Sequence, residues 1–245
     1  MMRSTNGVLR RVARFDRVEE DAATYGGVAQ KSLILVGATF VSALASMMFL
    51  PIGIGLVGLV VASIATLIVG LVISFNPTSA RTLSIPYALG QGLVLGMITS
   101  IYNVAYAGIG VLALAVTMAI FLVATVLYSS GIIRVGTFFR KLMFTLLIGS
   151  IFASLIVWIL SIFNPAIAQA VYGVDSPIAL GISAIMVVIS SLYVLISLDN
   201  VTKIVEHGVD RKYEWYAGFG ILINIIWLYM EVLRFLALIL NRSRR

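Results

Sequence analysis

The sequence contains no cysteine, one histidine and few charged residues. Only 11% of its 245 residues are Asp, Glu, Lys or Arg, whereas 61% are hydrophobic. A soluble domain carries about 25% charged residues, so most of this chain has no polar face to present to water. The lack of cysteine excludes disulfides, thiolate metal sites and cysteine nucleophiles. The lone histidine excludes the pair of histidines that an intramembrane metalloprotease needs.

The apolar stretches predict an all-α integral membrane protein with seven transmembrane helices. A spanning helix needs about 20 apolar residues, and turn signals such as Asn76-Pro77 and Asn164-Pro165 separate the stretches. We expect a basic N-terminal segment over 1–31, a transmembrane domain over 32–240 and a basic tail over 241–245. The predicted helices lie at about 32–50, 53–75, 85–103, 108–130, 138–163, 177–208 and 215–240.

Basic residues alternate between the predicted connections, and this pattern predicts the orientation. The N-terminal segment and the second, fourth and sixth connections contain Lys or Arg, and the first, third and fifth contain none. The basic-rich segments are therefore expected in the cytoplasm. We expect the protein in the cell's inner (plasma) membrane. This use of the basic residues also makes nucleic acid an unexpected partner for the net charge of +7. The basic residues of the sixth connection are Lys203, Arg211 and Lys212.

The basic tail conflicts with this alternation. Seven crossings would place Arg242, Arg244 and Arg245 on the outside, against the positive-inside rule. Either the tail is tolerated there because the first helices dominate orientation, or the last helix does not cross fully. We favour seven crossings.

Small residues predict one close helix contact. Gly92, Gly96 and Ser100 recur every fourth residue, which forms a face that another helix backbone can approach. By contrast, Gly53, Gly55 and Gly58 spell G-x-G-x-x-G by chance. That motif binds a dinucleotide only after a strand in a βαβ unit, and neither is predicted here.

Acidic residues inside the predicted spans occur only on the last two helices. Asp199 lies on the sixth helix, and Glu231 lies on the seventh with Arg234. A charge at the bilayer centre costs about 2.5–3.5 kcal/mol, so these groups should face the protein interior or water and have partners. Two nearby carboxylates can share a proton, and when ionised they suit a hard cation such as Ca²⁺.

Purely structural roles for these residues remain open. Asp199 can reach headgroup water from the cytoplasmic end of its helix, and Glu231 can pair with Arg234 three residues away. Asn224 is an alternative partner for Asp199. At a rise of about 1.5 Å per residue, Asp199 lies about 14 Å from the C-terminal end of its predicted helix and Asn224 about 14 Å from the N-terminal end of the next, so the two lie at a similar depth.

Two stretches resemble the transmembrane Bax inhibitor motif family, in particular its bacterial YccA-like branch. One is TYGGVAQKSLILVGATF, residues 24–40; the other runs from Glu206 to Leu238 and includes Glu214-Trp215-Tyr216 and Leu228-Tyr229-Met230-Glu231. The resemblance implies six helices around a central seventh and a pH-sensitive calcium leak through an acid pair. Asp199 and Glu231 match that pair by position, although the second acid is usually Asp. The interval between them is longer than in the channel-like members. The second helix also lacks a bridging basic residue, for which Arg234 could substitute.

The primary hypothesis is therefore a non-enzymatic calcium or cation leak gated by protonation of Asp199 and Glu231, without a cofactor. An alternative, also implied by the resemblance, is an interaction protein that modulates a membrane-bound protease through the N-terminal segment 1–25. An aspartyl intramembrane protease is the third hypothesis. The two acids fit its facing pair loosely and lack the glycine-flanked aspartate.

Overall fold

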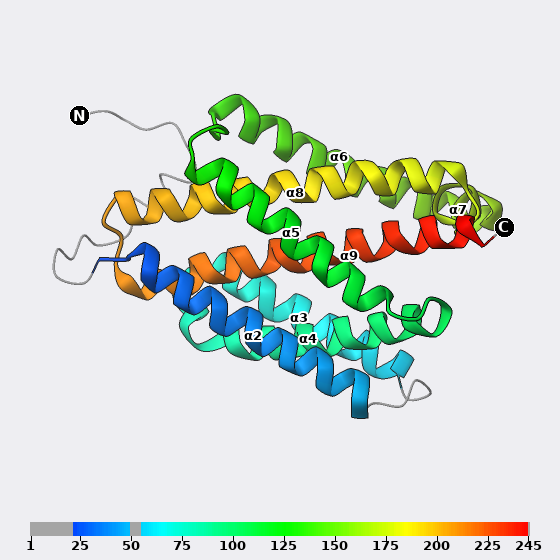
Figure 1. Ribbon diagram of the computed structural model, residues 1–245, viewed down its shortest axis with the longest axis horizontal. Helices are drawn as coiled ribbons and strands as arrows, with labels where there is room; N and C mark the ends of the chain where they lie inside the picture. The colour runs from blue at the N-terminus through cyan, green and yellow to red at the C-terminus, as the bar shows by residue number, and fades with distance from the viewer. Residues whose placement is uncertain (1–21, 50–54, 245) are drawn as a thin grey trace. The chain divides into compact units, whose positions relative to one another are not determined.

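The computed structural model describes residues 22–49 and 55–244, and these residues are almost entirely helical (Figure 1). Seven long helices have the length and composition needed to cross a membrane, which confirms the predicted fold class. An isolated β-bridge joins Ala22 to Asp210. The long helices are α2 (Tyr25–Phe49), α3 (Gly55–Phe75), α4 (Ala80–Ala105), α5 (Ile109–Ser129), α6 (Thr137–Phe163), α8 (Pro177–Glu206) and α9 (Glu214–Ser243); the short ones are η1 (Pro77–Ser79), α7 (Pro165–Tyr172) and η2 (Arg211–Tyr213).

Two differences from the predicted helix pattern are explained by helix capping. Helix α2 begins at Tyr25, well before the predicted start at residue 32, because the Thr24 hydroxyl accepts a hydrogen bond from the Gly27 amide at 2.9 Å and caps the first turn. Helix α7 is absent from the sequence prediction. Asn164 caps it by accepting from the Ala166 amide at 3.1 Å, and Pro165 occupies its first turn.

The chain divides into two compact units, which are described separately. Unit 1 comprises residues 1–98 and 197–223, and unit 2 comprises residues 99–196 and 224–245. The boundaries fall inside α4, α8 and α9, so each of these helices contributes to both units.

In unit 1, α2 and α4 pack with their backbones in close contact, at the face of α4 that the glycine spacing predicted. A Cβ atom on Gly92 would lie 2.3 Å from the Thr39 carbonyl oxygen, and one on Gly96 would lie 2.3 Å from that of Ala43. Beside these contacts, the Ser42 hydroxyl donates to the Leu89 carbonyl at 2.6 Å. The glycines are therefore needed for the approach of the two helices.

Three segments meet at one end of unit 1. The Ala23 amide donates to the Val209 carbonyl at 2.7 Å, which holds the start of α2 against the α8–α9 connection. Element η1, in the α3–α4 connection, contacts η2 of the α8–α9 connection. All three segments belong to the basic-rich group, so their common end agrees with the predicted alternation.

In unit 2, the C-terminal end of α9 meets the connections that lack Lys and Arg. Arg244 donates to the Ala105 carbonyl at 2.8 Å, and its guanidinium lies 4.8 Å from the centre of the Tyr106 ring. Asn241 accepts from the Tyr106 hydroxyl at 3.1 Å and donates to Asp175 in the α7–α8 connection at 2.8 Å. These contacts favour seven crossings, with the tail tolerated among the connections expected outside.

Candidate functional site

Asp199, in unit 1, forms an ion pair on its own helix. Its Oδ2 atom lies 2.7 Å from the Lys203 ammonium one turn further along α8, and the Asp199 side chain is 13% exposed. From the sequence, Lys203 was expected only to help orient the helices, not to pair with Asp199. The ion pair partly offsets the cost of placing this carboxylate in an apolar helix.

Glu231, in unit 2, is held by a neighbouring indole. The Trp227 Nε1–H donates to Glu231 Oε1 at 3.1 Å, one helical turn away. The other carboxylate oxygen, Oε2, is buried and has no hydrogen-bond partner among the described residues. Glu231 is therefore an only partly satisfied acid inside a predicted span.

Arg234 does not form the ion pair with Glu231 that its spacing allowed. Its guanidinium instead lies 5.1 Å from the centre of the Tyr172 ring, as a cation–π contact. Tyr172 belongs to α7, the short helix that the sequence analysis did not predict. The spacing allowed an ion pair because it considers only residues on the same helix, and it gives no sign of a partner on α7.

The pairing of Asp199 with either Glu231 or Asn224 stays a prediction. Asp199 belongs to unit 1, whereas Glu231 and Asn224 belong to unit 2. Within unit 2, the Asn224 amide donates to the Tyr193 carbonyl on α8 at 3.4 Å. In the described part of the chain, no three His, Asp or Glu side chains cluster to hold a metal ion. A calcium ion near the acids would therefore need further oxygen ligands from hydroxyls, carbonyls or water.

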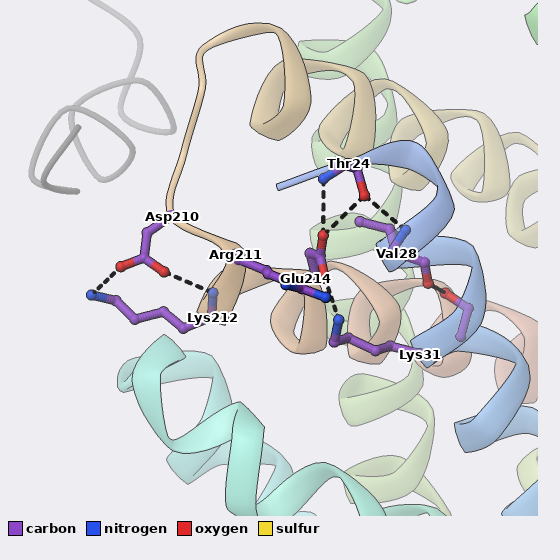
Figure 2. A network of polar contacts seen from close by, with 9 residues as sticks. Thr24, Val28, Lys31, Asp210, Arg211, Lys212 and Glu214 are labelled. Carbon is purple, nitrogen blue, oxygen red and sulfur yellow. Dashed lines mark hydrogen bonds and ion pairs between the residues drawn. The ribbon is translucent and has the colours of Figure 1, made fainter. Parts of the chain in front are cut away.

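A buried polar network that was not predicted from the sequence surrounds Glu214, the first residue of α9 (Figure 2). The Glu214 side chain is fully buried. Its Oε1 atom accepts from the Thr24 amide at 2.9 Å and from the Thr24 hydroxyl at 3.2 Å. Its Oε2 atom pairs with the Lys31 ammonium and lies 3.9 Å from Arg211 Nε. One carboxylate thus joins the start of α2, the start of α9 and η2 within unit 1.

Gly27 makes room for this carboxylate. A Cβ atom at Gly27 would lie 2.0 Å from Glu214 Oε1, a distance that no side chain tolerates. The Lys31 ammonium also lies 5.9 Å from the centre of the Trp215 ring. Thr24, Gly27, Lys31, Glu214 and Trp215 all fall in the two stretches that carried the family resemblance. That resemblance was the available signal, but it did not show that the two stretches touch.

Asp210 forms a second, more exposed contact beside this network, in the α8–α9 connection (Figure 2). It accepts from the Lys212 amide at 2.8 Å, and its other oxygen lies 2.9 Å from the Lys212 ammonium. The Lys212 amide and then its ammonium group hold the pKa of Asp210 below its ordinary value. Asp210 therefore caps η2 in its ionised form.

The proposed protease-binding segment lies almost wholly outside the described residues, which begin at residue 22. The interaction hypothesis for residues 1–25 accordingly stays a prediction.

Comparison with known proteins gives a family match that covers most of the chain. No curated protein and no solved structure matches the chain. A family described as Bax inhibitor 1 like matches residues 6–241, which includes every described helix except the last residues of α9. With its seven long apolar helices, the chain belongs to the Bax inhibitor 1 like family and is a multi-pass membrane protein.

Proposed function

We propose that this protein is a pH-sensitive cation leak, with calcium as the permeant ion, gated by protonation of Asp199 and Glu231. The observation that carries the proposal is the Glu231 carboxylate, which lies inside a predicted span with one buried oxygen lacking a donor among the described residues. The proposal includes no enzymatic step and no resident cofactor.

The environment of Glu231 supports a role in binding protons or cations. A buried polar atom without a partner costs about 1–3 kcal/mol, and more when the group is charged. Arg234 does not offset this cost by direct pairing, because its guanidinium lies on Tyr172. A proton or a cation bound at Oε2 would offset this free-energy cost, so the site favours binding of either one.

The environment of Asp199 supports a different part in the same mechanism. Lys203 already supplies a positive charge to its carboxylate, at 2.7 Å. A permeant cation must therefore compete with the Lys203 ammonium, and protonation of Asp199 would release that ammonium. Because the pair lies on the last turns of α8, close to the α8–α9 connection, this exchange would act at the entrance expected on the cytoplasmic side.

Calcium flux into liposomes tests the proposal. The purified protein is reconstituted with a calcium-sensitive dye inside the vesicles, and the rate of dye response is measured across a range of external pH. The wild-type protein should give a leak that changes with pH, and Asp199→Asn and Glu231→Gln should each abolish that change. The matched control is Glu206→Gln, which removes an exposed acid from the same helix as Asp199.

Three outcomes would remove the proposal, the third of them in the control variant. One is a wild-type leak no greater than that of protein-free vesicles at any pH. Another is an unchanged pH dependence in both acid variants. Loss of the pH dependence in Glu206→Gln would show that surface charge, and not the intramembrane acids, sets the response.

A further inference from the structure

We infer that Trp227 is a positioning residue for Glu231: its indole N–H fixes one carboxylate oxygen, which leaves the other as the oxygen that meets a proton or a cation. The role of that second oxygen rests on the proposed cation leak, whereas the hold of Trp227 on Glu231 can be tested without it.

The contact itself sets the direction of the carboxylate. Trp227 and Glu231 are four residues apart on α9, so their side chains lie on one face. The Nε1–Oε1 distance is 3.1 Å. Because the two oxygens of a carboxylate are rigidly linked, holding Oε1 also restricts where Oε2 can lie, and Oε2 is the buried oxygen without a partner among the described residues.

Two further helices of unit 2 hold the indole in place. The Tyr193 ring of α8 packs edge-on against Trp227, with ring centres 5.3 Å apart and planes at 60°. The Tyr193 hydroxyl donates to the Met143 carbonyl of α6 at 2.9 Å. Met143 is 1% exposed, whereas the most apolar stretch of α6 has no buried residue. A continuous chain of contacts thus runs from α6 through α8 to the carboxylate.

The other charged and titratable groups around Glu231 do not take over this role. Arg234, on α9, acts on Glu231 through its charge only, because its guanidinium packs on Tyr172 of α7. Tyr193, on α8, meets the indole with its ring and donates its hydroxyl proton to α6. In the described part of unit 2, the hydrogen bond that reaches the Glu231 carboxylate comes from Trp227.

Tryptophan fluorescence gives a readout that is independent of ion flux. The chain has three tryptophans, so Trp158→Phe combined with Trp215→Phe leaves Trp227 as the only indole emitter. In this background, reconstituted in lipid, Glu231→Gln should shift the Trp227 emission, because an indole donating to a carboxylate becomes an indole beside a neutral amide. The control Glu206→Gln should leave the emission unchanged. Identical Trp227 emission spectra before and after the Glu231→Gln substitution would overturn the inference.

A second arm measures the effect on the leak. Trp227→Phe keeps an aromatic ring beside Tyr193 but removes the N–H donor. It should move the pH midpoint of calcium leak by about one unit or more, since a hydrogen bond to a charged group is lost. Trp158→Phe, a substitution on the exposed face of α6, should leave the midpoint in place. An unchanged midpoint in Trp227→Phe would overturn the positioning role.

The two arms separate failure of the inference from failure of the proposed function. A fluorescence shift in Glu231→Gln without any calcium leak in the wild type would refute the proposed cation leak but support the Trp227–Glu231 contact. A pH-dependent leak that needs Glu231 but keeps its pH midpoint in Trp227→Phe would support the proposed cation leak and refute the positioning role of Trp227.

Discussion

Replacing Glu214 with glutamine should strongly destabilise unit 1. The carboxylate is fully buried, and it accepts from Thr24 while it pairs with the Lys31 ammonium, whose side chain is only 13% exposed. Glutamine has nearly the same shape, but it leaves Lys31 as a largely buried charge without its counterion. Removing one partner of a buried ion pair costs about 3–5 kcal/mol. For a chain of this size each kcal/mol lowers the melting temperature by about 2–4 °C, so the expected fall is about 6–20 °C.

A double-mutant cycle isolates the pair from other effects. Lys31→Met should also destabilise the protein, because it leaves the buried Glu214 carboxylate without its closest cation. The double variant Glu214→Gln with Lys31→Met removes both charges, so its loss should be smaller than the sum of the single losses by about 1–3 kcal/mol. Thermal unfolding in detergent, followed by circular dichroism, measures all three variants.

The control for this cycle is Glu206→Gln, at an exposed position, with an expected change within about 0.5 kcal/mol. A melting temperature of Glu214→Gln within about 2 °C of wild type, less than about 1 kcal/mol, would refute the reasoning. Strictly additive losses in the double variant would refute it as well, because they would show that the two side chains do not interact.

Three further predictions follow from the same end of unit 1 and from the chain's lack of cysteine. Gly27→Ala should cost about 1–3 kcal/mol in thermal unfolding, because its Cβ would collide with the buried carboxylate, whereas Gly26→Ala, with nothing within 4 Å, should cost less than Gly27→Ala. Asp210→Asn should reduce the loss of stability in acid. The folded-state pKa of Asp210 is depressed, so its carboxylate stabilises the folded protein above the ordinary pKa of about 3.9. That stabilisation fades as the pH falls through the folded-state pKa. The test is the melting temperature of the variant and of the wild type from about pH 6 down to about pH 2. An equal fall with pH in both proteins would contradict the role of Asp210. Because the chain has no cysteine, the variants Thr78→Cys and Ser243→Cys each carry a single thiol. When intact cells or spheroplasts are treated with a membrane-impermeant maleimide, only Ser243→Cys should react from outside. Labelling of both from one side would contradict seven crossings.

The fold was largely predictable because its main signals are local. Each spanning helix is a long apolar run, and each run is visible in the sequence without knowledge of its partners. The face of α4 that another helix backbone approaches was also predictable, since Gly92 and Gly96 mark it by their spacing, whereas the choice of α2 as the partner was not. The start of α2 was less predictable, because Thr24 and Gly27 are polar or small and their helix depends on contacts beyond the apolar run.

The polar contacts were less predictable because their partners are distant in sequence. Lys31 and Glu214 are 183 residues apart, and no spacing rule connects them. Arg234 shows the opposite failure: the spacing rule supplied a partner on the same helix, but a ring from the unpredicted helix α7 lies on its guanidinium. Local patterns give elements and faces, whereas the choice among competing partners depends on tertiary packing.

The contacts at the two ends of α9 restrict how Glu231 can act. In unit 1, the first residue of α9 is held through Glu214 to Thr24 and Lys31. In unit 2, Arg244 beyond its last turn donates to the Ala105 carbonyl. Sliding α9 along its axis would break polar contacts at both ends, so a change in charge at Glu231 is better transmitted sideways. The chain through Trp227 to α8 and α6 offers such a lateral route. In the proposed cation leak, gating should therefore rearrange side chains and neighbouring helices around a fixed α9.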